Sequence, residues 1–116
     1  MDKSKLKILI FGGGAIGSHL TYCLLSNKTK IYTICRGEHY KTIKKKGLKL
    51  QVFQNDILKK KIILKESKNL IFLNDLKKLR GLTFDYIFIT IKLKDIKKNL
   101  IKKILKYSNS NTAFIP

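Results

Sequence analysis

With 116 residues, 44% of them hydrophobic, the chain is long enough for one domain with a hydrophobic core and too short for two. It has 26 Lys and Arg residues against 7 Asp and Glu residues, and because the lysines are spread over every segment we expect no specific nucleic-acid partner. No apolar run reaches the roughly 18 residues of a membrane span and no signal-peptide core follows Met1, so we expect a cytoplasmic protein without a membrane partner.

The first predicted elements are a buried strand and a glycine-rich turn. Leu6 to Phe11 is apolar apart from one lysine, as expected for a strand that is covered on both faces. Gly12, Gly14 and Gly17 then fill the pattern G-x-G-x-x-G, which in dinucleotide-binding folds permits a sharp turn, close approach of a pyrophosphate and close helix packing. A helix from Ala15 to about Asn27 would direct its free amides and its positive dipole end at the phosphates.

The helix and a second strand complete a βαβ unit. Apolar residues at helical spacing predict the buried face of the helix: Ile16, Leu20, Cys23 and Leu24. The second strand runs from about Lys30 to Cys35, which gives the unit the length of about thirty residues that the fingerprint requires. We expect Cys23 and Cys35 to be buried or half-buried free thiols, because they form neither a disulfide framework nor a metal-binding spacing.

Arg36 follows the second strand and favours NADP as the cofactor. Arginine is rare in this chain, where lysine supplies nearly all of the 26 basic residues, so an arginine at this place is informative. In dinucleotide folds an acidic residue here binds the 2′-hydroxyl of NAD, whereas arginine accommodates the 2′-phosphate of NADP. No acidic residue stands at the strand end, since Glu38 comes two positions later. A surface arginine at a turn is the alternative.

The middle of the chain predicts a helix, a hairpin and a short strand. Gly47 stops the helix, and alternating apolar residues on both sides of a polar turn indicate the hairpin. In chain order we expect a helix over residues 38–46, a β-hairpin over 48–64 that extends the edge of the sheet, a strand over 70–73, and a brief helix capped by Asn74 or Asp75 and ending at Arg80.

Phe84 to Ile91 predicts another buried strand. Ligands of open α/β sheets bind beyond the carboxyl ends of the strands, so Thr90 and Lys92 should lie beside the glycine turn. Lys92 is therefore a candidate phosphate or ribose contact, and a chance position in a lysine-rich chain is the alternative. A helix over about 94–106 and a strand from Ala113 should follow.

Together these stretches resemble the N-terminal domain of the ketopantoate reductase (2-dehydropantoate 2-reductase) family. The matching stretches span nearly the whole chain in the right order: Ile8 to Ser18, Arg36 to His39, Gly47-Leu48, Asn74-Asp75 and Asp85 to Lys92. The resemblance implies an α/β, Rossmann-type dinucleotide-binding fold over residues 1–116, with a mostly parallel sheet, helices on both faces and an edge β-hairpin. It also implies an oxidoreductase that converts ketopantoate to pantoate with NADPH, on the route to pantothenate and coenzyme A.

The resemblance assigns cofactor-binding roles by position. They fall on Gly12, Gly13, Gly14, Ala15, Ile16 and Gly17 at the pyrophosphate, Arg36 at the 2′-phosphate, and Lys92 against the cofactor. Family members carry their catalytic lysine and an acidic substrate-binding residue in a helical C-terminal domain that this sequence lacks. We therefore expect no catalytic residue here, and binding of a small 2-oxo acid only together with that domain. The spacing of the two cysteines gives no reason to expect a metal.

Two other functions stay open. A free-standing dinucleotide-binding or sensing module would share every motif above. A reductase of another 2-oxo acid would differ only in substrate-reading residues of the missing part. A nucleic-acid-binding protein would instead gather lysines and aromatic residues on one face, and the sequence shows no such grouping.

Overall fold

The computed structural model describes residues 5–12, 14–91, 98–108 and 113–115. Its elements are, in chain order, β1 (Leu6–Phe11), α1 (Ala15–Leu24), β2 (Thr29–Ile34), α2 (Gly37–Lys46), β3 (Leu48–Gln54), β4 (Ile57–Leu64), β5 (Leu70–Leu73), the 3-10 helix η1 (Leu76–Leu79), β6 (Tyr86–Ile89), α3 (Lys98–Leu105) and β7 (Ala113–Ile115). None of the helices in these ranges is long and apolar enough to cross a membrane.

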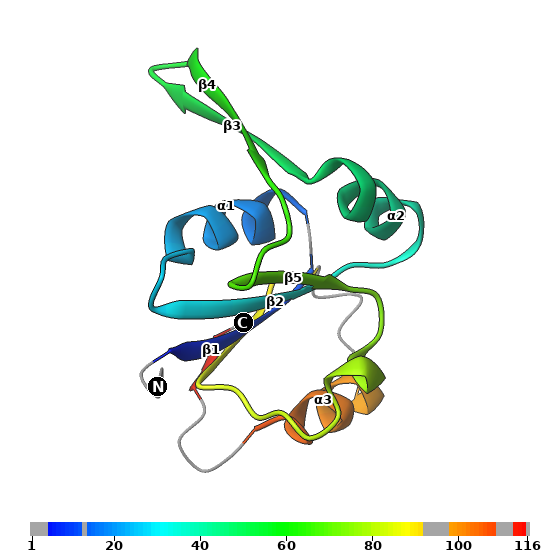
Figure 1. Cartoon of the computed structure of the whole chain (residues 1–116). Helices are drawn as coiled ribbons and strands as arrows, with labels where there is room; N and C mark the ends of the chain where they lie inside the picture. Colours follow the sequence, from blue (N-terminus) through cyan, green and yellow to red (C-terminus); the bar gives the residue numbers. More distant parts are fainter. Residues whose placement is uncertain (1–4, 13, 92–97, 109–112, 116) are drawn as a thin grey trace.

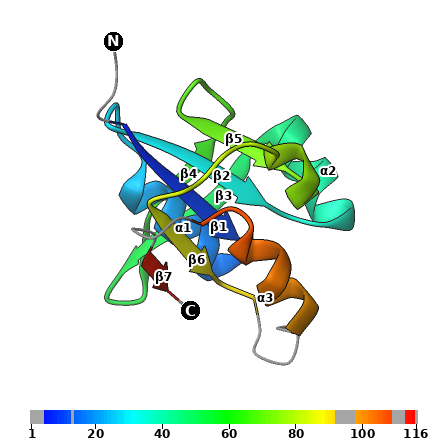
Figure 2. The ribbon, with the colours of Figure 1, turned by 90° about the horizontal axis from the view of Figure 1, so that it is seen from below.

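Five strands form one parallel sheet in the order β5-β2-β1-β6-β7. The chain moves outward from β1 through β2 to β5 and then returns to the other side of β1 with β6 (Figure 2). The strand order therefore reverses between β1 and β6. In open α/β sheets this is the point at which ligands bind, beyond the carboxyl ends of the strands.

Helices cover both faces of the sheet, which confirms the predicted fold class. In Figure 1, α1 and α2 lie on one face and α3 lies on the other. Side chains of a strand point alternately to opposite faces. Accordingly, Ile8 and Ile10 join the core beneath α1 and α2, whereas Leu9 and Phe11 join the core beneath α3 and η1. The strand that leads into the glycine turn is thus buried on both sides.

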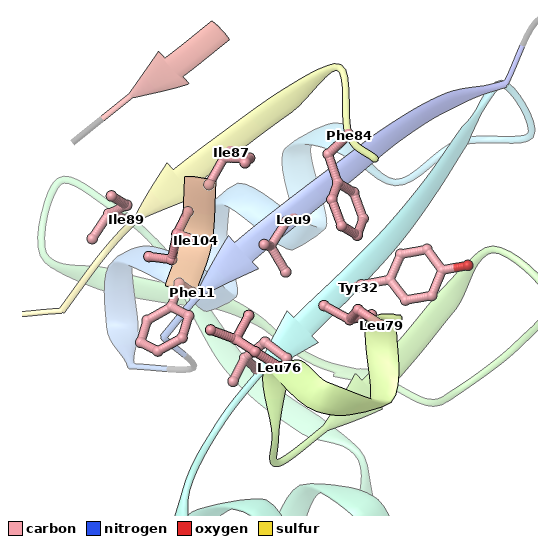
Figure 3. Packing of buried hydrophobic residues seen from close by; sticks show 10 residues of the cluster. Leu9, Phe11, Tyr32, Leu76, Leu79, Phe84, Ile87, Ile89 and Ile104 are labelled. Atoms are coloured by element: carbon pink, nitrogen blue, oxygen red, sulfur yellow. The ribbon is translucent and has the colours of Figure 1, made fainter. Parts of the chain in front are cut away.

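The core beneath α3 fixes that helix against the centre of the sheet (Figure 3). Four elements each contribute a side chain with 0% of its surface exposed: Leu9 from β1, Ile87 from β6, Leu79 from η1 and Ile104 from α3. Burying each such aliphatic side chain contributes about 1.5–3 kcal/mol. The positions of η1 and α3 relative to the end of β1 therefore follow from packing.

The predicted hairpin forms, but its predicted place in the sheet is wrong. β3 and β4 make a separate two-stranded antiparallel sheet. It projects beyond the layer of α1 and α2 (Figure 1). Leu48 and Leu50 are buried at its base, whereas Phe53 and Ile57 near its tip are 56% and 62% exposed. The edge beside β2 is taken by β5, whose parallel pairing buries Leu70 completely.

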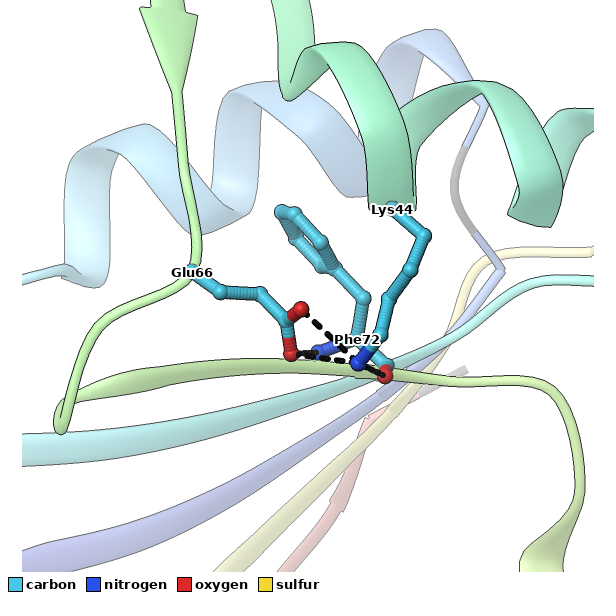
Figure 4. Close-up of polar contacts among 3 residues, drawn as sticks. All are labelled: Lys44, Glu66 and Phe72. Carbon is cyan, nitrogen blue, oxygen red and sulfur yellow. Dashed lines mark hydrogen bonds and ion pairs between the residues drawn. The ribbon is translucent and has the colours of Figure 1, made fainter.

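Glu66 joins the returning end of the hairpin to α2 and β5 (Figure 4). Its carboxylate lies 2.8 Å from the Lys44 ammonium and accepts a hydrogen bond of 3.1 Å from the backbone amide of Phe72. Lys44 also donates to the Phe72 carbonyl at 3.4 Å. The three residues hold α2 against β5, because the Glu66 carboxylate accepts from a backbone amide of this strand, which lies at the edge of the described sheet.

Several element boundaries differ from the sequence-based prediction. α1 ends at Leu24 rather than near Asn27. The Thr29 hydroxyl donates a hydrogen bond of 2.9 Å to the Leu24 carbonyl, and the chain then turns into β2. The predicted strand over 84–91 is regular only over Tyr86–Ile89. α3 spans Lys98–Leu105, and the predicted helical residues 94–97 lie outside the described residues.

Small residues, rather than the predicted apolar ones, line the face of α1 that meets the sheet. Gly17 and Thr21 are buried, whereas the two predicted leucines pack at the margin of the core. Ile16 is 68% exposed and Cys23 is exposed, so the expected placement of both in the buried face is wrong. α1 lies too close to β1 for large side chains to fit between them.

Two residues at the end of β2 are buried with different consequences. Cys35 is buried, as expected, and burial raises the pKa of its thiol from 9.0 to about 11, so the thiol stays neutral at physiological pH.

The Thr33 hydroxyl is buried and finds no hydrogen-bond partner among the described residues. A buried hydroxyl without a partner costs about 1–3 kcal/mol.

Replacing Thr33 with valine should therefore stabilise the protein by about 1 kcal/mol, because the methyl group keeps the shape and removes the unpaired hydroxyl. The measurement is the urea midpoint of unfolding. Thr21→Val is the matched control, since the buried Thr21 hydroxyl donates to the Gly17 carbonyl at 2.8 Å and its loss should destabilise the fold. Equal losses of stability in both variants would show that the Thr33 hydroxyl is paired in solution.

Candidate functional site

The turn between β1 and α1 lies where the strand order reverses, and hydrogen bonds hold it from both sides. On one side, the Gly12 amide donates to the Ile34 carbonyl at the end of β2, at 2.9 Å. On the other side, the Thr90 amide donates to the Phe11 carbonyl at 3.0 Å, and the Thr90 hydroxyl lies 3.1 Å from the Gly12 carbonyl. The predicted position of Thr90 beside the glycine turn is thus confirmed.

Two of the glycines are required by close packing, and one of them also by its backbone conformation. Gly12 has φ +124°, and a Cβ added there would lie 2.5 Å from the Thr90 hydroxyl oxygen. A Cβ added to Gly17 would overlap the carbonyl oxygen of Gly12. The first turn of α1 therefore rests directly on the backbone at the end of β1.

Gly14 differs from both, because the space around it is open. Apart from its chain neighbours, a Cβ added there would meet no atom of the described residues within 4 Å. Gly14 is the N-cap of α1, where no side chain caps the helix and no acidic residue occupies the first turn. The first amides of a helix have no intrahelical acceptor and carry its positive dipole end. An anion can approach these amides directly, so the amino end of α1 fits a phosphate group.

Part of the predicted cofactor-binding set falls outside the described residues. Gly13 and Lys92 both do so. Ala15 and Ile16 are the first residues of α1, and the Ile16 side chain points into solvent. Any contact that Ile16 makes with a ligand at the turn would come from its backbone.

Arg36 follows β2 directly and is the N-cap residue of α2. Its side chain is exposed, and among the described residues the guanidinium has no ion-pair partner. It lines a hollow of about 290 Å³ at the carboxyl ends of β1 and β2, on the face of the sheet that carries η1 and α3. The hollow is lined by Phe11, Arg36, Asn74, Asp75, Leu76, Lys77, Leu100, Lys103, Lys106 and Tyr107.

Cations outnumber carboxylates around this hollow. Among the described residues it has four basic side chains and one acidic one, Asp75, whose carboxylate accepts a hydrogen bond of 3.0 Å from the backbone amide of Lys77. A neighbouring hollow of about 620 Å³ shares Lys77 and Lys106 and adds Arg80. Both arginines of the chain thus line this connected surface. The sequence did not single out its lysines, because nothing distinguishes them from the many others.

A third hollow, of about 700 Å³, lies on the other side of the glycine turn. It is lined by Gly14, Ser18, His19, His39, Lys49, Leu50, Gln51 and Phe53. His19 and His39 thus share a hollow with the glycine turn. In the part of the chain that the structure describes, no group of three or more His, Cys, Asp or Glu side chains could hold a metal ion.

Comparison with known proteins gives a consistent family match. Residues 8–116 match the family model of the ketopantoate reductase PanE/ApbA. No curated protein sequence gives a significant match.

Solved structures share the fold. A protein assigned as a ketopantoate reductase from Ralstonia solanacearum MolK2 has a TM-score of 0.67 at 19% identity, over 96% of this chain and 31% of its own. One assigned as a 2-dehydropantoate 2-reductase from Enterococcus faecalis gives 0.67 at 23% identity, over 94% and 32%. The 2-dehydropantoate 2-reductase from Methylococcus capsulatus gives 0.64 at 19% identity, over 94% and 32%. This chain thus spans about a third of the length of these proteins.

The glycine geometry predicts losses of stability of different size for the same substitution at two positions. Gly17→Ala should destabilise the fold by about 1–3 kcal/mol, because the added methyl group must push α1 away from the Gly12 carbonyl. Gly14→Ala should cost under about 1 kcal/mol, since the methyl group enters open space and the only loss is a preferred capping residue. Urea unfolding of the two variants beside the wild type checks this. Equal stabilities would mean that α1 does not rest on the backbone of the turn.

Proposed function

Because the chain belongs to the ketopantoate reductase PanE/ApbA family, we propose that it is the NADP(H)-binding domain of a 2-dehydropantoate 2-reductase. Such an enzyme reduces ketopantoate to pantoate on the route to pantothenate and coenzyme A. The observation that carries the choice of cofactor is the place of Arg36, in a basic hollow at the end of β2, next to the glycine turn. The domain comprises residues 1–116.

In this proposal the glycine turn holds the pyrophosphate. The residues involved are Gly12, Gly13, Gly14, Ala15, Ile16 and Gly17. Gly12 and Gly17 act indirectly, because they set the distance between α1 and β1, whereas Gly14 leaves the phosphates free access to the helix amides. Lys92, which follows β6 in the chain, is proposed as a further contact to the cofactor on the strength of its position alone.

The 2′-phosphate is assigned to Arg36. The guanidinium offers a planar pair of donors to phosphate oxygens and has no competing carboxylate among the described residues. Among the described residues, Asp75 is the only acidic one that lines the hollow, and its carboxylate already accepts a hydrogen bond from the Lys77 amide. The hollow therefore favours a charged phosphate over a neutral ribose hydroxyl, which an acidic side chain would bind.

The chemistry of the reaction needs more than this domain. When bound, the nicotinamide supplies the hydride, and the residues of this chain bind and orient the cofactor. None of the described residues is proposed as catalytic. A 2-oxo acid substrate and its proton donor are assigned to the two thirds of the related proteins that this chain does not cover.

The proposal predicts that the chain binds NADP(H) more tightly than NAD(H) and that Arg36 causes the difference. Arg36→Ala should weaken NADP binding about tenfold to a hundredfold, because a hydrogen-bonded contact between charged groups is lost. NAD binding should stay nearly unchanged, since the glycine turn is untouched. Isothermal titration calorimetry of the wild type and of Arg36→Ala with each cofactor measures these affinities.

Arg36→Lys serves as the conservative control. It keeps the charge and loses the planar fork, so it should recover only part of the NADP affinity. Equal affinity of the wild type for the two cofactors would refute the assignment. Equal losses for both cofactors in Arg36→Ala would move Arg36 from the 2′-phosphate to the fold or the pyrophosphate.

A further inference from the structure

The hollow that contains Arg36 has a second wall, formed by α3, and that wall carries a cation of its own. Lys103 lines the same hollow as Arg36 although the two residues are far apart in the sequence. We propose that Lys103 is a second determinant of 2′-phosphate specificity, acting on the same phosphate group as Arg36. This inference rests on the proposed function, because it deepens the assignment of that site.

The packing of α3 fixes where Lys103 lies. Ile104 is fully buried in the core beneath α3, and Leu100 packs against that core. Residues three apart in a helix share a face, so Leu100 places Lys103 on the side of α3 that lines the hollow. Lys102 is exposed as well, but it does not line the hollow.

Two other lysines of the hollow are placed differently. Lys77 and Lys106 line both this hollow and the neighbouring one that contains Arg80. Lys103 and Arg36 line only the first. Of the lysines at this surface, Lys103 is therefore the one confined to the Arg36 hollow.

In the part of the chain that the structure describes, acidic side chains do not balance the positive charges of the hollow. Asp75 is its only carboxylate and forms no ion pair with Arg36 or Lys103 among the described residues. Like charges around a shared hollow repel one another, and an entering dianionic phosphate removes that repulsion. An adenosine without the 2′-phosphate gains nothing from the same charges. Lys103 therefore adds discrimination between the two cofactors rather than general affinity.

The test uses the adenosine half of the cofactor, so that the nicotinamide half plays no part. The whole chain is titrated with 2′,5′-ADP and with 5′-AMP, which differ only in the 2′-phosphate, at about 0.15 M salt. Lys103→Ala should weaken 2′,5′-ADP binding about threefold to tenfold, as for a charge contact that is partly open to water. Binding of 5′-AMP should change less than twofold.

Lys102→Ala is the matched control, since it removes the same charge from the same helix. It should leave the ratio of the two affinities unchanged. In the double variant Arg36→Ala/Lys103→Ala, the preference for 2′,5′-ADP should disappear. Circular dichroism confirms that each variant keeps its helices.

The outcomes separate the inference from the function on which it rests. A wild type without preference for 2′,5′-ADP overturns both. A preference that Arg36→Ala abolishes and Lys103→Ala leaves intact overturns the role of Lys103 alone. Equal losses in Lys103→Ala and Lys102→Ala show that only net charge matters, which also overturns it.

Discussion

The candidate cofactor site depends on one backbone contact, the close packing of Gly17 against the carbonyl of Gly12. Because no side chain separates them, the first turn of α1 lies directly on the end of β1. The same contact explains the small residues on the buried face of α1, among them Thr21. It also places the start of α1 at the carboxyl end of β1, where the strand order reverses. A ligand that binds the first backbone amides of α1 approaches along the edge of the sheet where the strand order reverses.

Electrostatics then distinguishes this edge from the rest of a uniformly basic surface. Exposed ion pairs, such as Lys41 with Glu38 at 3.4 Å, contribute little because water screens them. Among the described residues around the Arg36 hollow, four basic side chains face one carboxylate; Lys77 and Lys103 lie in η1 and α3, and the other two flank α2 and α3. Packing produces this arrangement, since the core beneath η1 and α3 brings their lysines to the end of β2. The net charge of the chain alone would not have located it.

The sequence predicted the elements whose signal is local. The apolar run of β1, the glycines and the strand-end Arg36 each carry their own pattern, and the parallel sheet follows from their order. The errors concern how elements meet. Ile16 and Cys23 fit a helical face, but close helix–strand contact turns small residues inward instead. The separate hairpin and the position of Lys103 depend on the packing of segments distant in sequence, which periodicity does not encode.

The central claim is that the crevice at the glycine turn holds a dinucleotide whose 2′-phosphate lies in the Arg36 hollow. A crystal structure of the chain with NADP⁺ tests it most directly. We expect the pyrophosphate at the amino end of α1 and the 2′-phosphate within hydrogen-bonding distance of the Arg36 guanidinium. A dinucleotide bound in the hollow of His19 and His39, with Arg36 turned to solvent, would contradict the claim.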